Sequence, residues 1–360
     1  MHLRPLTLRL LLPLASLLSL AAAPARAFAK PADVTTTYRV QQTVKLSDIP
    51  ADAKSVKWWI AIPDDERFQE VLDFSVTSAP GSWKIVTEPD RGNRFMYVEV
   101  ANPNTSTLTS QVEFTVRRRS VFVDLDPARV GPITDSHRRL FVDDLRRDAP
   151  HMKVTPRIAK LADEACGNET NVATQALLLL GAVADYADHY SKDPSKPHCG
   201  IGDAEDCMTN AGGCCTDLHS MFIALARARG IPSRLQMGYR LREPNEGKEV
   251  DPGYRCWAEY FVPNYGWVPA DIVEADALEG LGRTRWFTGL TERRLWLNEG
   301  REFDLAGRAV TEKRVNTMVI GYAEIDGVEA RLLPEGDVPE QLTRRVHYTE
   351  LKPATAVAAK

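Results

Sequence analysis

The sequence GGCCTDLHSMFIALARARGIP occupies residues 212–232 and combines a glycine turn, a cysteine pair and an amphipathic helix. Apolar side chains at Leu218, Phe222 and Leu225 recur at helical spacing, and Gly230, followed closely by a proline, ends the pattern. A cysteine at the start of such a helix lies beside unpaired N–H groups and the positive end of the helix dipole, which favour its thiolate. The stretch therefore predicts a nucleophilic thiol.

Two strands follow this helix, YRCWAEY at residues 254–260 and GWVPAD at residues 266–271. The short connection between them predicts an antiparallel hairpin. Such a pairing would hold Arg255 and Asp271 side by side, near the cysteine helix. A thiol nucleophile needs an activating base and a third group that orients the base, so the hairpin is the expected place for both.

These segments resemble the transglutaminase-like superfamily, relatives of papain-type thiol enzymes, over roughly residues 160–290. In this family the nucleophile lies in a Gly-x-Cys-Thr-Asp-x-His-Ser-like turn before a helix that ends in Arg-x-x-Gly-Ile-Pro-x-Arg. The chain has GCCTDLHS at residues 213–220 and RARGIPSR at residues 227–234. The resemblance implies that Cys215 is the nucleophile and that it acts on amide bonds, by hydrolysis or acyl transfer.

The hairpin matches the family at only one of its two catalytic positions. The acid of the family, the Asp of Gly-Trp-Val-Pro-x-Asp, is Asp271 here, but the base, a His just before Cys/Ala-Trp-x-Glu, is replaced by Arg255. A guanidinium can pair with Asp271 and lower the pKa of a nearby thiol. It cannot shuttle protons near neutrality, because its pKa exceeds about 12. The predicted catalytic residues are therefore Cys215, Arg255 and Asp271, without an ordinary base.

Four neighbouring residues are candidates for auxiliary roles. His219 or His198 can substitute as the base, although His219 shares a helix face with Cys215 at a position where the family has a structural His. A structural role is therefore favoured for His219. Cys214 is interpreted as a packed or disulfide-bonded cysteine, and Trp257 as a residue that shapes the core and the hairpin.

All six cysteines lie between residues 166 and 256. In an oxidising compartment one disulfide among Cys199, Cys207 and Cys214 is compatible with their closeness in sequence, but the spacing does not select the pair. A zinc site at His198, Cys199 and Cys207 is the competing interpretation, and the spacings fit no Cys-x-x-Cys pattern. No metal or cofactor is expected.

The N-terminus has the features of a secretory signal peptide over residues 1–27. A basic start precedes an apolar run at residues 10–23, which is too short to span a bilayer comfortably, and Ala27 ends a small-x-small cleavage site. The prediction is a secreted or periplasmic protein with no membrane span after cleavage; an uncleaved anchor is the alternative. The formal net charge of −4, without a basic stripe, argues against nucleic acid as a partner.

The predicted fold class is α+β. Short strands with turn residues between them predict a β-sandwich over residues 34–124, and a charged helical linker follows over residues 125–165. Residues 166–350 are expected to form the transglutaminase-like (papain-like) domain, in which the cysteine helix packs on an antiparallel sheet. Its C-terminal strands are expected to complete or flank that sheet. A further helix is predicted from Asn171 to Tyr190.

Three functional hypotheses follow from these observations. The first is a secreted or periplasmic transglutaminase-like enzyme that acts on protein or peptide substrates, or on cell-envelope polymer. Because this enzyme lacks the His base, it would act on substrates with good leaving groups. The second is a catalytically inactive binding protein of the cell envelope that has lost the His base. The third is a β-sandwich adhesion protein whose second domain is a spacer, and it depends on fold class alone.

Overall fold

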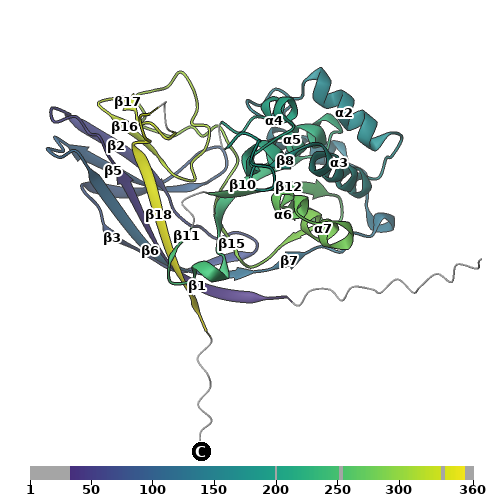
Figure 1. Cartoon of the computed structure of the whole chain (residues 1–360), viewed down its shortest axis with the longest axis horizontal. Coiled ribbons are helices and arrows are strands. Elements are labelled where there is room, and N and C mark those ends of the chain that lie inside the picture. Colours follow the sequence, from purple (N-terminus) through teal and green to yellow (C-terminus); the bar gives the residue numbers. More distant parts are fainter. Residues whose placement is uncertain (1–32, 199–200, 251–253, 334–336, 353–360) are drawn as a thin grey trace, which may run out of the picture. The chain divides into compact units, whose positions relative to one another are not determined.

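The computed structural model describes residues 33–198, 201–250, 254–333 and 337–352. The signal peptide expected over residues 1–27 lies outside these ranges. The described chain combines antiparallel β-sheets with helices packed on a smaller sheet, which confirms the α+β fold class (Figure 1). In the described ranges, no helix is both long and apolar enough to cross a membrane.

Two five-stranded antiparallel sheets form the β-sandwich. In spatial order, the first contains β11 (Glu249–Val250), β18 (Leu342–Leu351), β1 (Thr35–Leu46), β6 (Leu108–Arg119) and β3 (Gln69–Ser78). The second contains β17 (Val328–Glu329), β16 (Tyr322–Ile325), β2 (Ser55–Ala61), β5 (Arg94–Ala101) and β4 (Ser82–Thr87).

The two sheets share an apolar core. Every second residue of β1 from Tyr38 to Leu46 is buried, which is the period of a strand with one face on a core. The side-chain amide of Gln42 in β1 donates to the carbonyl of Ala61 at the end of β2, 2.8 Å away. The sheets therefore pack with their buried faces toward each other.

The C-terminal strands join this sandwich. Strand β18 pairs with β1 from Thr37↔Leu351 to Leu46↔Leu342, and β16 pairs with β2. The expectation that the C-terminal strands complete or flank the sheet of the second domain holds for the segment Arg294–Glu299, which pairs with Ser233–Arg240 in that sheet, but it is therefore wrong for β16 and β18. Their apolar alternation indicates a half-buried strand, but it does not indicate which open edge the strand will pair with.

The helical region lies between these β-segments in the sequence. It follows β7 (Val121–Phe122), and its first elements are η1 (Pro127–Arg129), α1 (Asp135–Leu140), η2 (Asp143–Leu145) and α2 (Pro156–Cys166). The later helices are α3 (Val172–Tyr186), α4 (Ala204–Asn210), α5 (Cys215–Ala228), η3 (Glu243–Asn245), α6 (Ile272–Asp276) and α7 (Gly280–Phe287). Helix α3 ends before the predicted Tyr190 because the backbone becomes extended at Ala187.

A four-stranded antiparallel sheet supports the cysteine helix. In spatial order it contains β13 (Gly266–Ala270), β12 (Arg255–Val262), β10 (Ser233–Arg240) and β15 (Arg294–Glu299). The two-stranded pairs are β8 (Asp188–His189) with β9 (Gly212–Gly213), and β7 with β14 (Gly289–Leu290). The predicted β12–β13 hairpin is confirmed. Helix α5 contacts β12 and β10 on one side and α2, α3, α4 and α6 on others, so it is buried along nearly its whole length.

Candidate active site

The start of α5 is shaped by two glycines and an aspartate. A Cβ added at Gly212 in β9 would lie 2.4 Å from the carbonyl oxygen of Asp188 in β8, so the close parallel pairing of these strands requires glycine. Cys214 continues in an extended conformation, and its N–H donates to Oδ2 of Asp217 at 2.9 Å. Cys215 is consequently the first helical residue, where backbone N–H groups have no intrahelical acceptor.

The environment of Cys215 favours the thiolate. The residue is 1% exposed and carries a free thiol. Hydrogen bonds from the side chains of Cys214 and Cys256 lower the pKa of Cys215 well below its usual range, and the positive charge of Arg255 lowers it further against the opposing effect of burial. These are the surroundings of a nucleophilic thiol rather than of an inert core cysteine.

The thiol of Cys256 in β12 is part of this environment. Its Sγ lies 3.6 Å from Oγ1 of Thr216 and 3.4 Å from Nδ1 of His219. Burial raises the pKa of Cys256 well above its usual range, and its hydrogen bond to Cys215 raises it further. Cys256 therefore keeps its proton, and its single S–H group is the donor for which Oγ1 of Thr216 and the Cys215 thiolate compete.

His219 is bonded to backbone through both ring nitrogens. Nε2 accepts from the N–H of Ile272 at 3.0 Å, so the neutral ring carries its proton on Nδ1, which donates to the carbonyl oxygen of Cys215 at 2.6 Å. Burial lowers the pKa of His219 and keeps the ring neutral. The imidazole ties the first turn of α5 to the start of α6, and neither nitrogen is left to accept the thiol proton.

Asp271 is almost completely buried at the N-cap of α6. Its Oδ2 accepts from Nε and Nη2 of Arg294 in β15, at 3.0 and 2.6 Å. Burial would raise the pKa of Asp271, but Arg294 outweighs this effect and holds it below the usual range. The ion pair expected between Asp271 and Arg255 is thus replaced by one with Arg294. Asp271 lies one residue beyond β13, where the chain turns into α6 and faces β15.

Of the other predicted site residues, Arg255 lies near Cys215 and His198 lies on the surface. Arg255 begins β12, donates from Nη1 to the carbonyl of Tyr254 at 3.3 Å, and is close enough to act on Cys215 through its charge. His198 is exposed and stacks on Tyr190, with ring centroids 4.4 Å apart. It is therefore a surface residue of this region.

Residues 159–272 match the family model of the transglutaminase-like superfamily. The match contains the cysteine helix and the hairpin. These residues form a transglutaminase-like domain. An uncharacterized protein from Haemophilus influenzae is 29% identical over 329 residues, which cover 81% of this chain and 86% of that protein. The crystal structure of a putative cysteine protease from Cytophaga hutchinsonii shares the fold, with a TM-score of 0.57, 16% identity, and coverage of 90% of this chain and 93% of that one.

One buried histidine of the transglutaminase-like domain is not marked by any sequence pattern. His189 in β8 is 2% exposed and pairs with Gly213, two residues before Cys215. Burial lowers the pKa of His189, and the negative charge of Cys215 works against that effect, so the two groups interact electrostatically. No motif marks His189. It falls in the stretch predicted as helix, and only the pairing of β8 with β9 brings it beside the thiol.

The cysteines of the domain bear on the disulfide and zinc hypotheses. Cys166, Cys207, Cys215 and Cys256 carry free thiols. Among the described residues, no group of three or more His, Cys, Asp or Glu could hold a metal ion. Cys199, which belongs to both hypotheses, lies outside the described residues.

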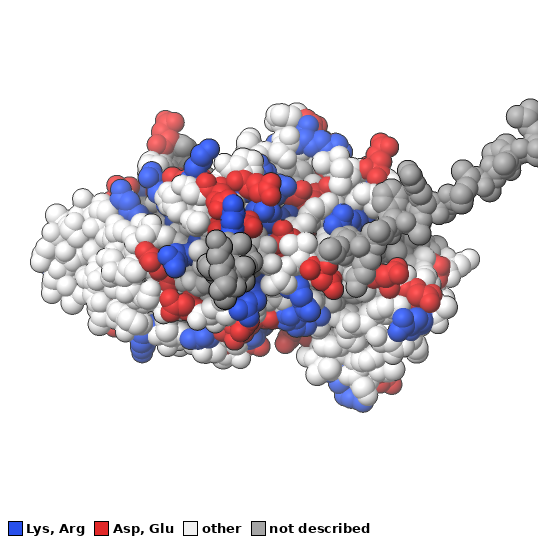
Figure 2. All heavy atoms as spheres, turned by 90° about the horizontal axis from the view of Figure 1, so that it is seen from below, with Lys and Arg blue, Asp and Glu red and all other residues white. Residues whose placement is uncertain are grey.

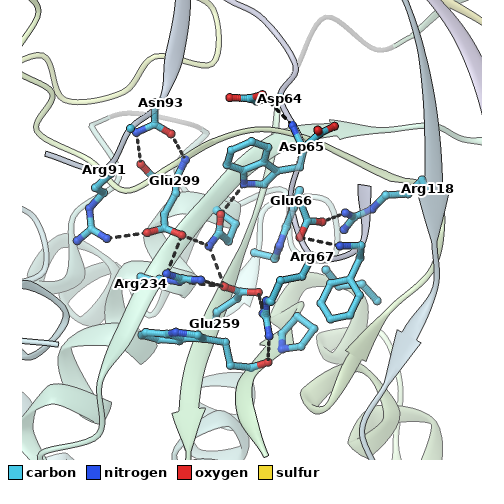
Figure 3. A pocket seen from close by; sticks show the side chains of 18 residues that line it. Asp64, Asp65, Glu66, Arg67, Arg91, Asn93, Arg118, Arg234, Glu259 and Glu299 are labelled. Carbon is cyan, nitrogen blue, oxygen red and sulfur yellow. Dashed lines mark hydrogen bonds and ion pairs between the residues drawn. The ribbon is translucent and has the colours of Figure 1, made fainter. Parts of the chain in front are cut away.

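A charged pocket of about 280 Å³ lies beside the transglutaminase-like domain (Figure 3). Its charged lining residues are Asp64, Asp65, Glu66, Arg67, Arg91, Arg118, Arg234, Glu259 and Glu299. Trp257 also lines it, on the face of β12 opposite Cys256. Glu259 accepts from Arg67 at 2.6 Å and from Arg234 at 2.9 and 2.8 Å. The lining contains neither cysteine nor histidine, so the pocket is separate from the thiol chemistry.

Replacing Cys256 with alanine is expected to raise the pKa of the Cys215 thiol by roughly one to two units, because a hydrogen bond to a charged group contributes about 1.5–3 kcal/mol. The rate of alkylation by iodoacetamide as a function of pH measures this pKa. Cys207→Ala, which removes a buried thiol from α4, is the matched control and should leave the profile unchanged. A profile that is the same in Cys256→Ala would show that Cys256 does not donate to the thiolate.

Proposed function

We propose that this protein is an enzyme that acts on amide bonds of protein or peptide substrates through the Cys215 thiolate. The observation that supports this is the thiol at the first position of α5, with its pKa lowered by two side-chain donors and by Arg255. The signal-like residues 1–27 favour a secreted or periplasmic location. Cell-envelope polymer is therefore a further substrate class. On the face shown in Figure 2, acidic and basic side chains are interspersed.

The chemistry needs a nucleophile, oxyanion donors and a proton for the leaving group. The thiolate attacks the carbonyl carbon, and N–H groups at the start of α5 stabilise the resulting oxyanion. The C–N bond then breaks as the nitrogen takes a proton, which leaves a thioester that water or an amine resolves. Arg255 cannot give up its proton near neutral pH, and His219 is bonded at both nitrogens. Water therefore protonates the leaving group, and substrates with good leaving groups react fastest.

A non-catalytic binding protein of the cell envelope is the second candidate function. The observation that favours it is Arg255 at the position of the base, combined with the backbone bonds that occupy His219. In that case the domain would keep the fold and bind peptides or envelope polymer without turnover.

Cys215 is expected to alkylate with an apparent pKa well below about 8.5, the ordinary value for cysteine, because its surroundings stabilise the thiolate. Cys215→Ser is expected to lose at least about 10³-fold in acylation by a p-nitrophenyl ester of a short peptide, since it removes the nucleophile. Mass spectrometry of the labelled protein identifies the modified residue, and Cys207→Ala is the control. Sluggish labelling of Cys215, together with an ester reaction that survives Cys215→Ser, would favour the binding protein.

A further inference from the structure

A buried imidazole lies beside the start of α5. His189 pairs with Gly213 across the parallel β8–β9 pair, and the N–H of Tyr190 donates to the carbonyl of Gly213 at 2.9 Å. Side chains of paired residues project to the same face of a sheet, and so do residues two apart in an extended chain. Because Cys214 is extended, Cys215 continues on the face occupied by His189.

The hydrogen bonds of His189 fix which nitrogen carries the proton. The backbone N–H of Ser191 can only donate, and it donates to Nδ1 at 3.2 Å; Oγ of Ser191 lies 2.7 Å from the same nitrogen. The neutral ring therefore has its proton on Nε2. The segment is anchored by Asp276, whose Oδ2 accepts from the N–H of His189 at 3.2 Å and whose Oδ1 accepts from Lys192 at 2.8 Å.

The Nε2–H group has no hydrogen-bond partner among the described residues. A buried donor without a partner destabilises a fold by about 1–3 kcal/mol, so its retention points to an acceptor that arrives during function. A second donor lies nearby. Cys215 is the first residue of α5, and within the described ranges its backbone N–H is likewise unbonded.

We propose that His189 donates its Nε2–H to the oxyanion that forms when Cys215 attacks a substrate carbonyl, and that the backbone N–H of Cys215 is the second donor. The inference rests on the proposed function. As the C–S bond forms, the carbonyl π electrons move to oxygen, and the imidazole stabilises that charge without transferring its proton. The burial that keeps His189 neutral suits this role, because a neutral ring with Nδ1 already accepting presents a fixed donor.

Two reactions of Cys215 separate this role from an effect on the thiol itself. Acylation by a p-nitrophenyl ester passes through an oxyanion, whereas alkylation by iodoacetamide does not. His189→Leu, which fills the space but has no donor, is expected to slow acylation by about 10²–10³-fold and to change alkylation by less than about twofold. His189→Gln restores a donor and is expected to recover acylation to within about tenfold of the wild type.

The outcomes are distinguishable. Should the leucine variant not fold, His189→Ala is the second donor-free variant, and thermal unfolding checks both. His347→Ala removes an exposed imidazole from β18 and should change neither reaction. Acylation that is unchanged without the donor would overturn the role of His189 while the function stands. If the alkylation rate falls in parallel with the acylation rate, His189 acts on the reactivity of the Cys215 thiol and not on the oxyanion. A wild-type Cys215 that alkylates but never acylates would overturn the function and this role together.

Discussion

Arg255→His is expected to accelerate amide cleavage or transfer by about 10²-fold, toward the lower end of the 10²–10⁴-fold range of general acid–base catalysis. An imidazole at the start of β12 can exchange protons near neutral pH, which a guanidinium cannot. The gain is limited because Oδ2 of Asp271 is already bonded by Arg294, so the new ring lacks an oriented carboxylate. The measurement is kcat/KM for a peptide amide as a function of pH.

Arg255→Lys is the matched control for this experiment. It keeps a positive charge near Cys215 but adds no group that titrates near neutrality in an ordinary setting. The histidine variant should also show a new inflection in its pH–rate profile, whereas the lysine variant should not. If the rate of Arg255→His stays flat or falls, the missing proton shuttle is not what limits the native protein.

Arg294→Met is expected to destabilise the fold by about 3–5 kcal/mol, because it leaves the Asp271 carboxylate buried without its charge partner. Both side chains are at most 2% exposed, so water cannot replace the guanidinium. Urea unfolding at neutral pH measures the change in the free energy of unfolding. Arg117→Met removes an exposed ion pair with Glu70 and should change that free energy by less than about 1 kcal/mol.

The loss of stability caused by Arg294→Met should be larger at neutral pH than at acidic pH. The pKa of Asp271 is lowered in the folded protein, so its pairing contributes fully above the unfolded value of about 3.9 and is lost as the pH falls through the folded value. In the variant, burial without the guanidinium raises the pKa of Asp271 instead. The difference in stability between the variant and the wild type is therefore expected to begin to shrink above about pH 4 and to lose its charge-dependent part as the pH falls through the lowered wild-type value. A difference that stays constant from pH 7 to pH 3 would mean that packing of the Arg294 side chain, not its charge, stabilises the fold.

Much of the site could be predicted from patterns of residues that are close together in the sequence. Leu218, Phe222 and Leu225 recur at helical spacing, and a glycine turn precedes them, so α5 and the cysteine at its start could be placed. The β12–β13 hairpin was predictable for the same reason, since its two strands are joined by a short turn. Each of these features depends on residues that are close in sequence.

Other parts of the site depend on contacts between distant segments. The partner of Asp271 is Arg294, which lies on a strand that does not neighbour the hairpin in sequence. Cys256 was seen only as part of a strand motif, and its contact with Cys215 joins β12 to α5. The pairing of β18 with β1 joins strands close to the two ends of the described chain. No local pattern specifies such partners, because many segments offer equivalent edges and charges.

The amino-acid sequence by itself placed the candidate nucleophile, since a cysteine, a glycine turn and an amphipathic helix are adjacent in the chain and helix formation alone puts the thiol at the positive end of the dipole. The tertiary structure decided the rest of the chemistry. Which donor lowers the pKa of Cys215, which cation neutralises Asp271 and whether His189 reaches the thiol all depend on strand pairing across long loops. Electrostatic effects act over a few ångströms in space, and only folding converts separation along the chain into such distances.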